Sequence, residues 1–85
     1  MTDEHVRPPA TASDLTARQL AVASLIAQAR TDQQIAGTLG ISDRRVRVHV
    51  EALCYLLHCD RGCNVRIQIA KWWWEQTPAL REDAA

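Results

Sequence analysis

The chain has 85 residues, of which 47% are hydrophobic and 24% charged, with three Gly and three Pro. This length supports one small domain with a modest core and excludes a sensor domain joined to a second domain. The formal net charge is zero, but residues 15–75 carry eight basic and five acidic side chains and so a net +3. Non-specific attraction to nucleic acid is therefore expected to be weak and sensitive to salt.

The first fourteen residues are polar, include Pro8 and Pro9, and predict a disordered leader over residues 1–14. The first helix is expected to begin after Thr16, a favourable N-cap residue with Gln19 three positions on, as in a capping box. Apolar residues at helical spacing carry this helix to about Ala29.

The stretch from Thr31 to Leu57 predicts two helices joined by a tight turn. Thr31 begins a second capping box, and Gly40 follows the last apolar residue, where a left-handed C-cap favours glycine. Ser42 can cap the next helix. This layout is typical of a helix-turn-helix, in which the second helix enters the DNA major groove. An ordinary helical hairpin is the alternative, because it uses the same caps.

The helix after this turn has two distinct faces. An apolar stripe at i, i+4, i+7 and i+11 is expected to face the core: Val46, Val50, Leu53 and Leu57. The opposite face carries polar residues and one valine: Arg44, Arg47, Val48 and Glu51. Three arginines within four residues, the third being Arg45, suit phosphate and guanine contacts. A solvated charged face is the alternative, and the preceding turn favours DNA contact over it.

Residues 58–65, HCDRGCNV, are expected to form a loop that concentrates side chains able to bind metal. The weak candidates for a zinc site are Cys54, His58, Cys59 and Cys63. Because no CxxC knuckle is present and the cysteine count is odd, free thiols are favoured over a metal site or a redox-active pair of Cys59 and Cys63. No metal and no cofactor are therefore expected.

The last helix is expected to follow Asn64 as its cap, with the sequence VRIQIAKWWWEQ, and to end before Pro78. Consecutive helical residues point about 100° apart, so Trp72, Trp73 and Trp74 cannot all face one small core. An exposed tryptophan beside apolar residues favours an interface over a ring that lies flat on its own domain. Residues 77–85 predict a flexible tail.

Several segments, taken in order, resemble the C-terminal DNA-binding domain of LuxR/NarL-type (GerE-like) bacterial transcription regulators. The resemblance covers about residues 15–74 and is carried by Leu15-Thr16-Ala17-Arg18, Leu25-Ile26-Ala27, Ile35-Ala36, Leu39-Gly40-Ile41-Ser42, Val46-Arg47-Val48-His49 and Ile69-Ala70. It implies an all-α fold, a four-helix LuxR-type helix-turn-helix bundle over residues 15–76 with disordered termini. In that family the third helix reads the major groove and the fourth commonly mediates dimerisation.

The resemblance also implies roles for individual residues. Base contacts are expected from Arg47, Val48 and Glu51, and contacts to the DNA backbone from Arg44, Arg45 and His49, with Thr31 and Ser42 as further candidates at helix N-termini. For His49, a packed structural role is an equal alternative. A homodimer interface on the last helix fits both the resemblance and the tryptophan pattern, and its expected residues are Ile67, Ala70, Lys71, Trp73 and Trp74.

The chain departs from the family pattern at five positions. Glutamate is usual in place of Gln19 and Ala21, glycine in place of Ala29, threonine in place of Arg45, and lysine in some members in place of Glu51. A glutamate that faces the groove can accept a hydrogen bond from cytosine N4 but repels phosphate. The usual base preference of the family is therefore in doubt for this chain.

Together these features predict a stand-alone, sequence-specific transcription regulator that binds double-stranded DNA as a homodimer. A cytoplasmic location is expected, because no apolar run is long enough to span a membrane and no signal peptide follows Met1. The alternative is an interaction module that binds RNA polymerase or a larger regulator through the Trp-rich helix. An enzyme is not expected, since the sequence has no carboxylate pair, no Ser/His/Asp arrangement and no phosphate-binding loop.

Overall fold

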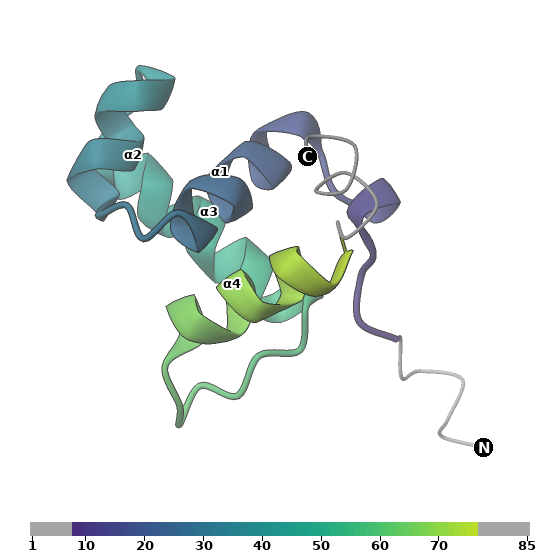
Figure 1. Ribbon diagram of the computed structural model, residues 1–85. Helices are drawn as coiled ribbons and strands as arrows, with labels where there is room; N and C mark the ends of the chain where they lie inside the picture. The colour runs from purple at the N-terminus through teal and green to yellow at the C-terminus, as the bar shows by residue number, and fades with distance from the viewer. Residues whose placement is uncertain (1–7, 77–85) are drawn as a thin grey trace.

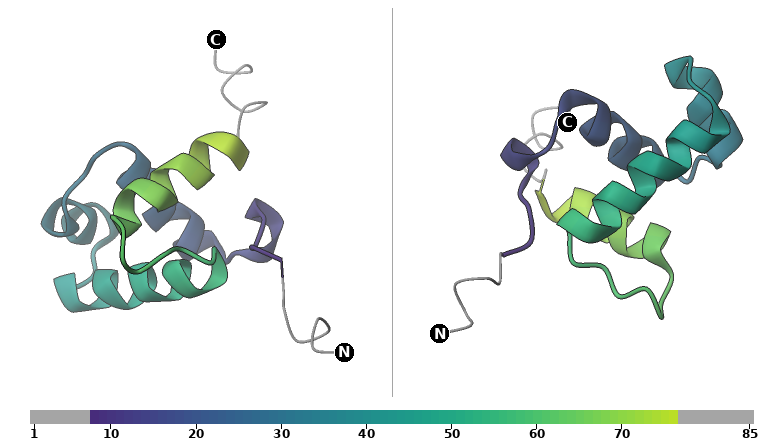
Figure 2. Two further views of the ribbon diagram at one scale, coloured as in Figure 1. Left: turned by 90° about the horizontal axis from the view of Figure 1, so that it is seen from below. Right: turned by 180° about the vertical axis from the view of Figure 1, so that it is seen from behind.

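The computed structural model describes residues 8–76, and all regular structure in this range is helical (Figures 1 and 2). A short 3-10 helix, η2 (Ala12–Asp14), precedes four α-helices: α1 (Ala17–Ala27), α2 (Asp32–Leu39), α3 (Asp43–Leu56) and α4 (Val65–Gln76). α1 packs most extensively against α4, and α2 packs on α3. The predicted all-α, four-helix fold is confirmed. None of these helices has the length and hydrophobicity needed to cross a membrane.

Each α-helix begins at the side-chain cap that the sequence predicts. At α1 the Thr16 hydroxyl accepts the Gln19 N–H at 3.1 Å, and the Gln19 side-chain oxygen accepts the Thr16 N–H at 3.0 Å. Both orphan amides at this end are thereby satisfied. The other three helices are capped by Thr31, Ser42 and Asn64. Loss of one such cap typically costs about 1 kcal/mol.

α1, α2 and α3 are each followed by a residue with a left-handed backbone: Ala29 at φ 64°, Gly40 at φ 69° and His58 at φ 58°. After Ala29, the Arg30 N–H donates to the Leu25 carbonyl at 3.1 Å, which satisfies one of the last carbonyls of α1. Glycine adopts this conformation without a steric penalty, whereas Ala29 and His58 hold a Cβ there. α1 therefore ends slightly before its expected end near Ala29.

We expect Ala29→Gly to raise the free energy of unfolding by about 1 kcal/mol, because glycine removes the Cβ clash at this left-handed position. Ala29 is exposed, so little packing is lost. Ala21→Gly, within α1, is the matched control and should lower the free energy of unfolding by about 1 kcal/mol. Urea unfolding followed by circular dichroism measures both. Destabilisation of Ala29→Gly to the same extent as the control would contradict the prediction.

The core lies where α1, α3 and α4 meet, with α2 closing one end (Figure 1). Its most completely buried side chains come from all four helices: Val22, Ile35, Val46, Leu53 and Ile69. The stripe predicted on α3 does face this core, since Val46, Leu53 and Leu57 are buried and Val50 is half-buried. The polar side of α3 is thereby turned outward.

Residues 8–14 belong to the folded domain, so the disordered leader predicted over residues 1–14 is wrong for this part of the chain. Ala10 is buried; its N–H donates to the Leu56 carbonyl at 3.0 Å, and its carbonyl accepts the Trp72 indole N–H at 2.9 Å. These two hydrogen bonds attach the segment to the end of α3 and to α4. The polar sequence of the segment does not predict this attachment, because one bond uses the backbone N–H and the other the backbone carbonyl of Ala10. Residues 1–7, and the tail predicted over residues 77–85, lie outside the described residues.

Candidate nucleic-acid interface

Three features fix the turn between α2 and α3: a backbone conformation, a packing contact and a hydrogen bond. Gly40 takes the left-handed conformation that lets the chain reverse, and Ile41 packs, half-buried, against the core. From α1, the Arg18 guanidinium donates to the Leu39 carbonyl at 3.3 Å, which satisfies a free carbonyl at the end of α2. The two helices therefore have a fixed relative position, with α3 (teal) lying along the lower side of the molecule in Figure 2, left.

The outer face of α3 presents the residues predicted to contact DNA. Arg44, Arg45, Arg47, Val48 and Glu51 are all exposed. Val48 is 53% exposed and so is available for an apolar contact to a partner on this face. The structure thus brings five predicted site residues together on one accessible surface, with the arginines near the N-terminus of α3.

Thr31 and Ser42 lie at the N-termini of α2 and α3, and both are exposed. Their hydroxyl oxygens accept hydrogen bonds from the N–H groups of Gln34 and Arg45 at 3.1 and 3.0 Å. Each hydroxyl hydrogen remains able to donate to an anion. Capping and phosphate contact are therefore compatible at both positions.

His49 is half-buried on α3, between the core stripe and the exposed face. Desolvation lowers the pKa of its imidazole below the ordinary value, and the nearby positive charges of Arg45 and Arg18 lower it further. The side chain is therefore neutral near pH 7. Any phosphate contact by His49 in that range is a neutral hydrogen bond, and the same geometry also suits a packed structural role.

We expect His49→Gln to reduce the loss of stability in acid. Because the folded pKa is lowered, the unfolded chain takes up the proton first as the pH falls through about 6.5, and folding then loses free energy. The penalty is absent well above this pH and grows below it. Chemical unfolding of wild type and variant between about pH 7.5 and pH 5 measures the difference. Equal loss in both proteins would show that His49 does not contribute.

Two further side chains reach the same face, and sequence reasoning missed both. Tyr55 follows Glu51 by one helical turn and is 77% exposed, so helical spacing alone was a sufficient signal. Arg61, from the loop after α3, donates from Nη2 to Glu51 Oε1 at 2.7 Å. This hydrogen bond and the charge of Glu51 raise the pKa of the guanidinium, which stays cationic. No local pattern in the sequence indicates the contact.

The weak metal candidates do not form a site. Within residues 8–76, no group of three or more His, Cys, Asp or Glu side chains lies close enough to hold a metal ion. Cys54 is buried, whereas α3 ends before His58, which is exposed and has a left-handed backbone. Cys54 and His58 therefore do not lie one turn apart on a continuous helix, as their spacing in the sequence suggested.

The three thiols are free, and the neighbour of Cys59 is Cys54, which the alternative of a Cys59/Cys63 pair did not include. Cys59 lies beside Cys54: its N–H donates to the Cys54 carbonyl at 3.0 Å, and the Cys54 thiol points to the Cys59 carbonyl at 3.9 Å. Burial, together with Cys54, raises the pKa of the Cys59 thiol. A hydrogen bond to Asp60 and its charge raise the pKa of Cys63. Both thiols are thus less reactive than an ordinary cysteine.

α4 divides the three tryptophans as helical geometry requires. Ile69 and Trp72 are buried, Trp73 is half-buried against the core, and Trp74 is 41% exposed. The prediction that at least one tryptophan lies at the surface is confirmed. Ile67 is 65% exposed and Lys71 is also exposed, so both share the outer side of α4 with Trp74 at i, i+4 and i+7.

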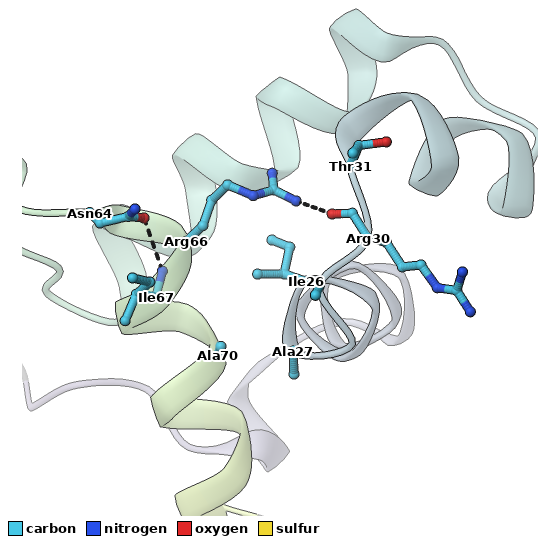
Figure 3. A pocket seen from close by; sticks show the side chains of 9 residues that line it. Ile26, Ala27, Arg30, Thr31, Asn64, Arg66, Ile67 and Ala70 are labelled. Carbon is cyan, nitrogen blue, oxygen red and sulfur yellow. Dashed lines mark hydrogen bonds between the residues drawn. The ribbon is translucent and has the colours of Figure 1, made fainter.

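A shallow groove of about 410 Å³ separates the end of α1 from the start of α4 (Figure 3). Its walls include apolar side chains from both helices: Ile26, Ala27, Ile67 and Ala70. Arg66 crosses one end, donating to the Arg30 carbonyl and to the Asp32 carboxylate. These contacts tie the N-terminal end of α4 to the connection between α1 and α2.

Comparison with known proteins gives a match to a protein family. The family model for bacterial regulatory proteins of the luxR family (GerE) matches residues 13–60, more than half of the chain. The matched region runs from η2 through the helix-turn-helix to the start of the loop after α3. No curated protein sequence and no solved structure shows significant similarity to the chain.

Proposed function

This chain belongs to the LuxR family of bacterial regulatory proteins, which are DNA-binding regulators rather than enzymes, and we propose that it reads specific sequences in double-stranded DNA as a homodimer. The observation that carries the proposal is the division of α3. One side is buried in the core, and the other holds three arginines directly after a fixed turn. A recognition helix that enters the major groove needs one side packed firmly on its domain and an exposed, positively charged side toward the DNA.

We assign base contacts to Arg47, Val48 and Glu51, because they lie on the outer face of α3. Contacts to the phosphate backbone are assigned to the residues nearest the helix N-termini and the edge of α3: Arg44, Arg45, His49, Thr31 and Ser42. The arginines supply charge, and the two hydroxyls supply neutral donors. A protein of this class in a bacterium would act in the cytoplasm, where the DNA lies.

The test of this function is selection of bound duplexes from a random DNA library. We expect one enriched motif, with two half-sites related by a palindrome, since a two-fold dimer presents two recognition helices. An enriched but unpaired half-site would support sequence reading without the dimer. No enrichment at moderate salt would overturn the function.

The proposed dimer uses the outer side of α4, through Ile67, Ala70, Lys71, Trp73 and Trp74. Support comes from the exposed apolar area of Ile67 and Trp74 on the same side of one helix. Large apolar side chains at a surface are typical of an interface core. Trp73 is half-buried within its own domain, so its expected contribution is smaller than that of Trp74.

We expect Trp74→Ala to lower the mass measured by analytical ultracentrifugation from dimer to monomer while the domain stays folded. The ring is a principal apolar group on the outer side of α4, and interfaces lose most when such an anchor is truncated. Tyr55→Ala removes an exposed aromatic from α3 instead and is the matched control, with an unchanged mass expected. A monomeric wild type at roughly tens of micromolar, or a dimeric Trp74→Ala, would rule out this interface.

A second function is favoured by one observation, the apolar groove between α1 and α4 beside exposed Ile67. In this reading the domain binds RNA polymerase or a larger regulator through α4, and DNA affinity is secondary. The near-neutral formal charge agrees with it. Co-purification with RNA polymerase that is lost in Ile67→Asp, together with no enriched DNA motif, would favour this function over the first.

A further inference from the structure

The loop between α3 and α4 places a cation on the proposed DNA-reading face. Arg61 Nη2 lies 2.7 Å from Glu51 Oε1, and the two side chains are 64% and 65% exposed. Glu51 is the only acidic residue among the proposed DNA contacts. A free carboxylate in the groove repels the phosphates on both strands. The positive charge of Arg61 beside it offsets this repulsion.

The loop that carries Arg61 is fixed rather than loosely attached. Gln68 of α4 bonds both backbone groups of Asp60: its Oε1 accepts the Asp60 N–H at 2.7 Å, and its Nε2 donates to the Asp60 carbonyl at 2.8 Å. The Asp60 carboxylate accepts the Gly62 N–H at 2.8 Å, which closes the turn around Arg61. Arg61 is therefore presented to α3 by a turn that is anchored on α4.

We propose that Arg61 is a positioning residue for specificity: it holds the Glu51 carboxylate so that this side chain can read a base in the major groove. The inference rests on the proposed DNA-reading function and deepens it. Arg61 offsets the charge of Glu51 and restricts its rotamers. Its hydrogen bond occupies Oε1, and Oε2 remains as an acceptor for an exocyclic amino group, such as cytosine N4.

A double-mutant cycle on the duplex enriched by wild type tests the inference. The variants are Arg61→Ala, Glu51→Ala, the double variant, and Arg61→Lys as the matched control that keeps the charge. We expect Arg61→Ala to weaken binding roughly fivefold and to relax the base preference at the same base pair as Glu51→Ala. In the Glu51→Ala background, loss of Arg61 should cost less than about twofold. Arg61→Lys should retain most of the preference.

Two results would overturn the positioning role. If Arg61→Ala leaves the preferred base unchanged, Arg61 does not act on the reading of Glu51. If its cost is equally large in the Glu51→Ala background, Arg61 contacts DNA independently. Because both side chains are exposed, the variants are expected to stay folded, and circular dichroism checks this.

The inference and the function fail in different ways. A wild type that enriches no motif would overturn both. A wild type that enriches a motif, with Arg47→Ala impaired and Arg61→Ala unaffected in affinity and base preference, would overturn only the role of Arg61. The selection is therefore run in parallel with wild type, Arg47→Ala and Arg61→Ala.

Discussion

Trp72→Ala is expected to lower the free energy of unfolding by about 3–5 kcal/mol, the range for truncating a large aromatic side chain in a core. The ring is 8% exposed and belongs to the core cluster. Its indole N–H also donates to the Ala10 carbonyl at 2.9 Å, so the substitution also removes one of the two hydrogen bonds that hold Ala10. A small domain has only about 5 kcal/mol of stability or somewhat more, so the variant is expected to keep little of it and to unfold at a much lower urea concentration than wild type.

Two further substitutions in α4, one at Trp74 and one at Trp72 itself, provide controls. Trp74→Ala is expected to cost far less, because Trp74 is 41% exposed. Trp72→Phe keeps an aromatic ring but removes the donor to Ala10, and should cost about 1–3 kcal/mol for a buried carbonyl left without its partner. Urea unfolding followed by far-UV circular dichroism compares the three proteins. A cost for Trp74→Ala equal to that of Trp72→Ala would contradict the assignment of Trp72 to the core.

The parts of the fold that sequence reasoning predicts are those set by neighbours along the chain. A capping box depends on residues three positions apart, and the boxes at Thr16 and Thr31 form as predicted. The stripe on α3 depends on helical spacing, and Val46 and Leu53 face the core accordingly. Local rules succeed here because both the cap and the stripe are satisfied within one helix or against one side of it.

Apart from Tyr55, which helical spacing could have placed, the contacts that sequence reasoning missed join different elements of the chain. Ala10 joins the fold through the carbonyl of Leu56 and the indole of Trp72, residues more than forty positions away. Arg61 reaches Glu51 only because Gln68 anchors the loop on α4. Neither contact leaves a periodic signal. Backbone hydrogen bonds in particular do not depend on the side chain of the residue that makes them.

Helical geometry gave a partial answer for the tryptophans. Spacing requires that Trp72, Trp73 and Trp74 point in different directions, and so predicts exposure of at least one. Which ring is buried depends on how α4 is rotated against α1, and that follows from the packing of the whole bundle. The same holds for the candidate site. The apolar stripe of α3 predicts which of its residues face outward, but it does not predict that Arg61 lies beside them.

Arg47→Ala is expected to weaken binding to the preferred duplex by about 1–3 kcal/mol and to relax the preference at one base pair. The side chain is exposed on the outer face of α3, one turn after the helix begins, where an arginine can bond guanine O6 and N7 together. Its loss would remove the proposed base contact. Fluorescence anisotropy with the selected duplex and single-base variants of it measures both effects.

Arg44→Ala is the matched control, because it removes the same charge from the same exposed face but from a residue assigned to phosphate. It should weaken all duplexes by a similar factor and reduce the slope of log K against log salt by about one, while the preferred sequence stays the same. The contrast between the two variants separates charge from base reading. A loss of affinity shared by all duplexes reports charge alone, and only a loss confined to the preferred duplex reports base reading. If both variants bind like wild type, α3 is not the reading helix.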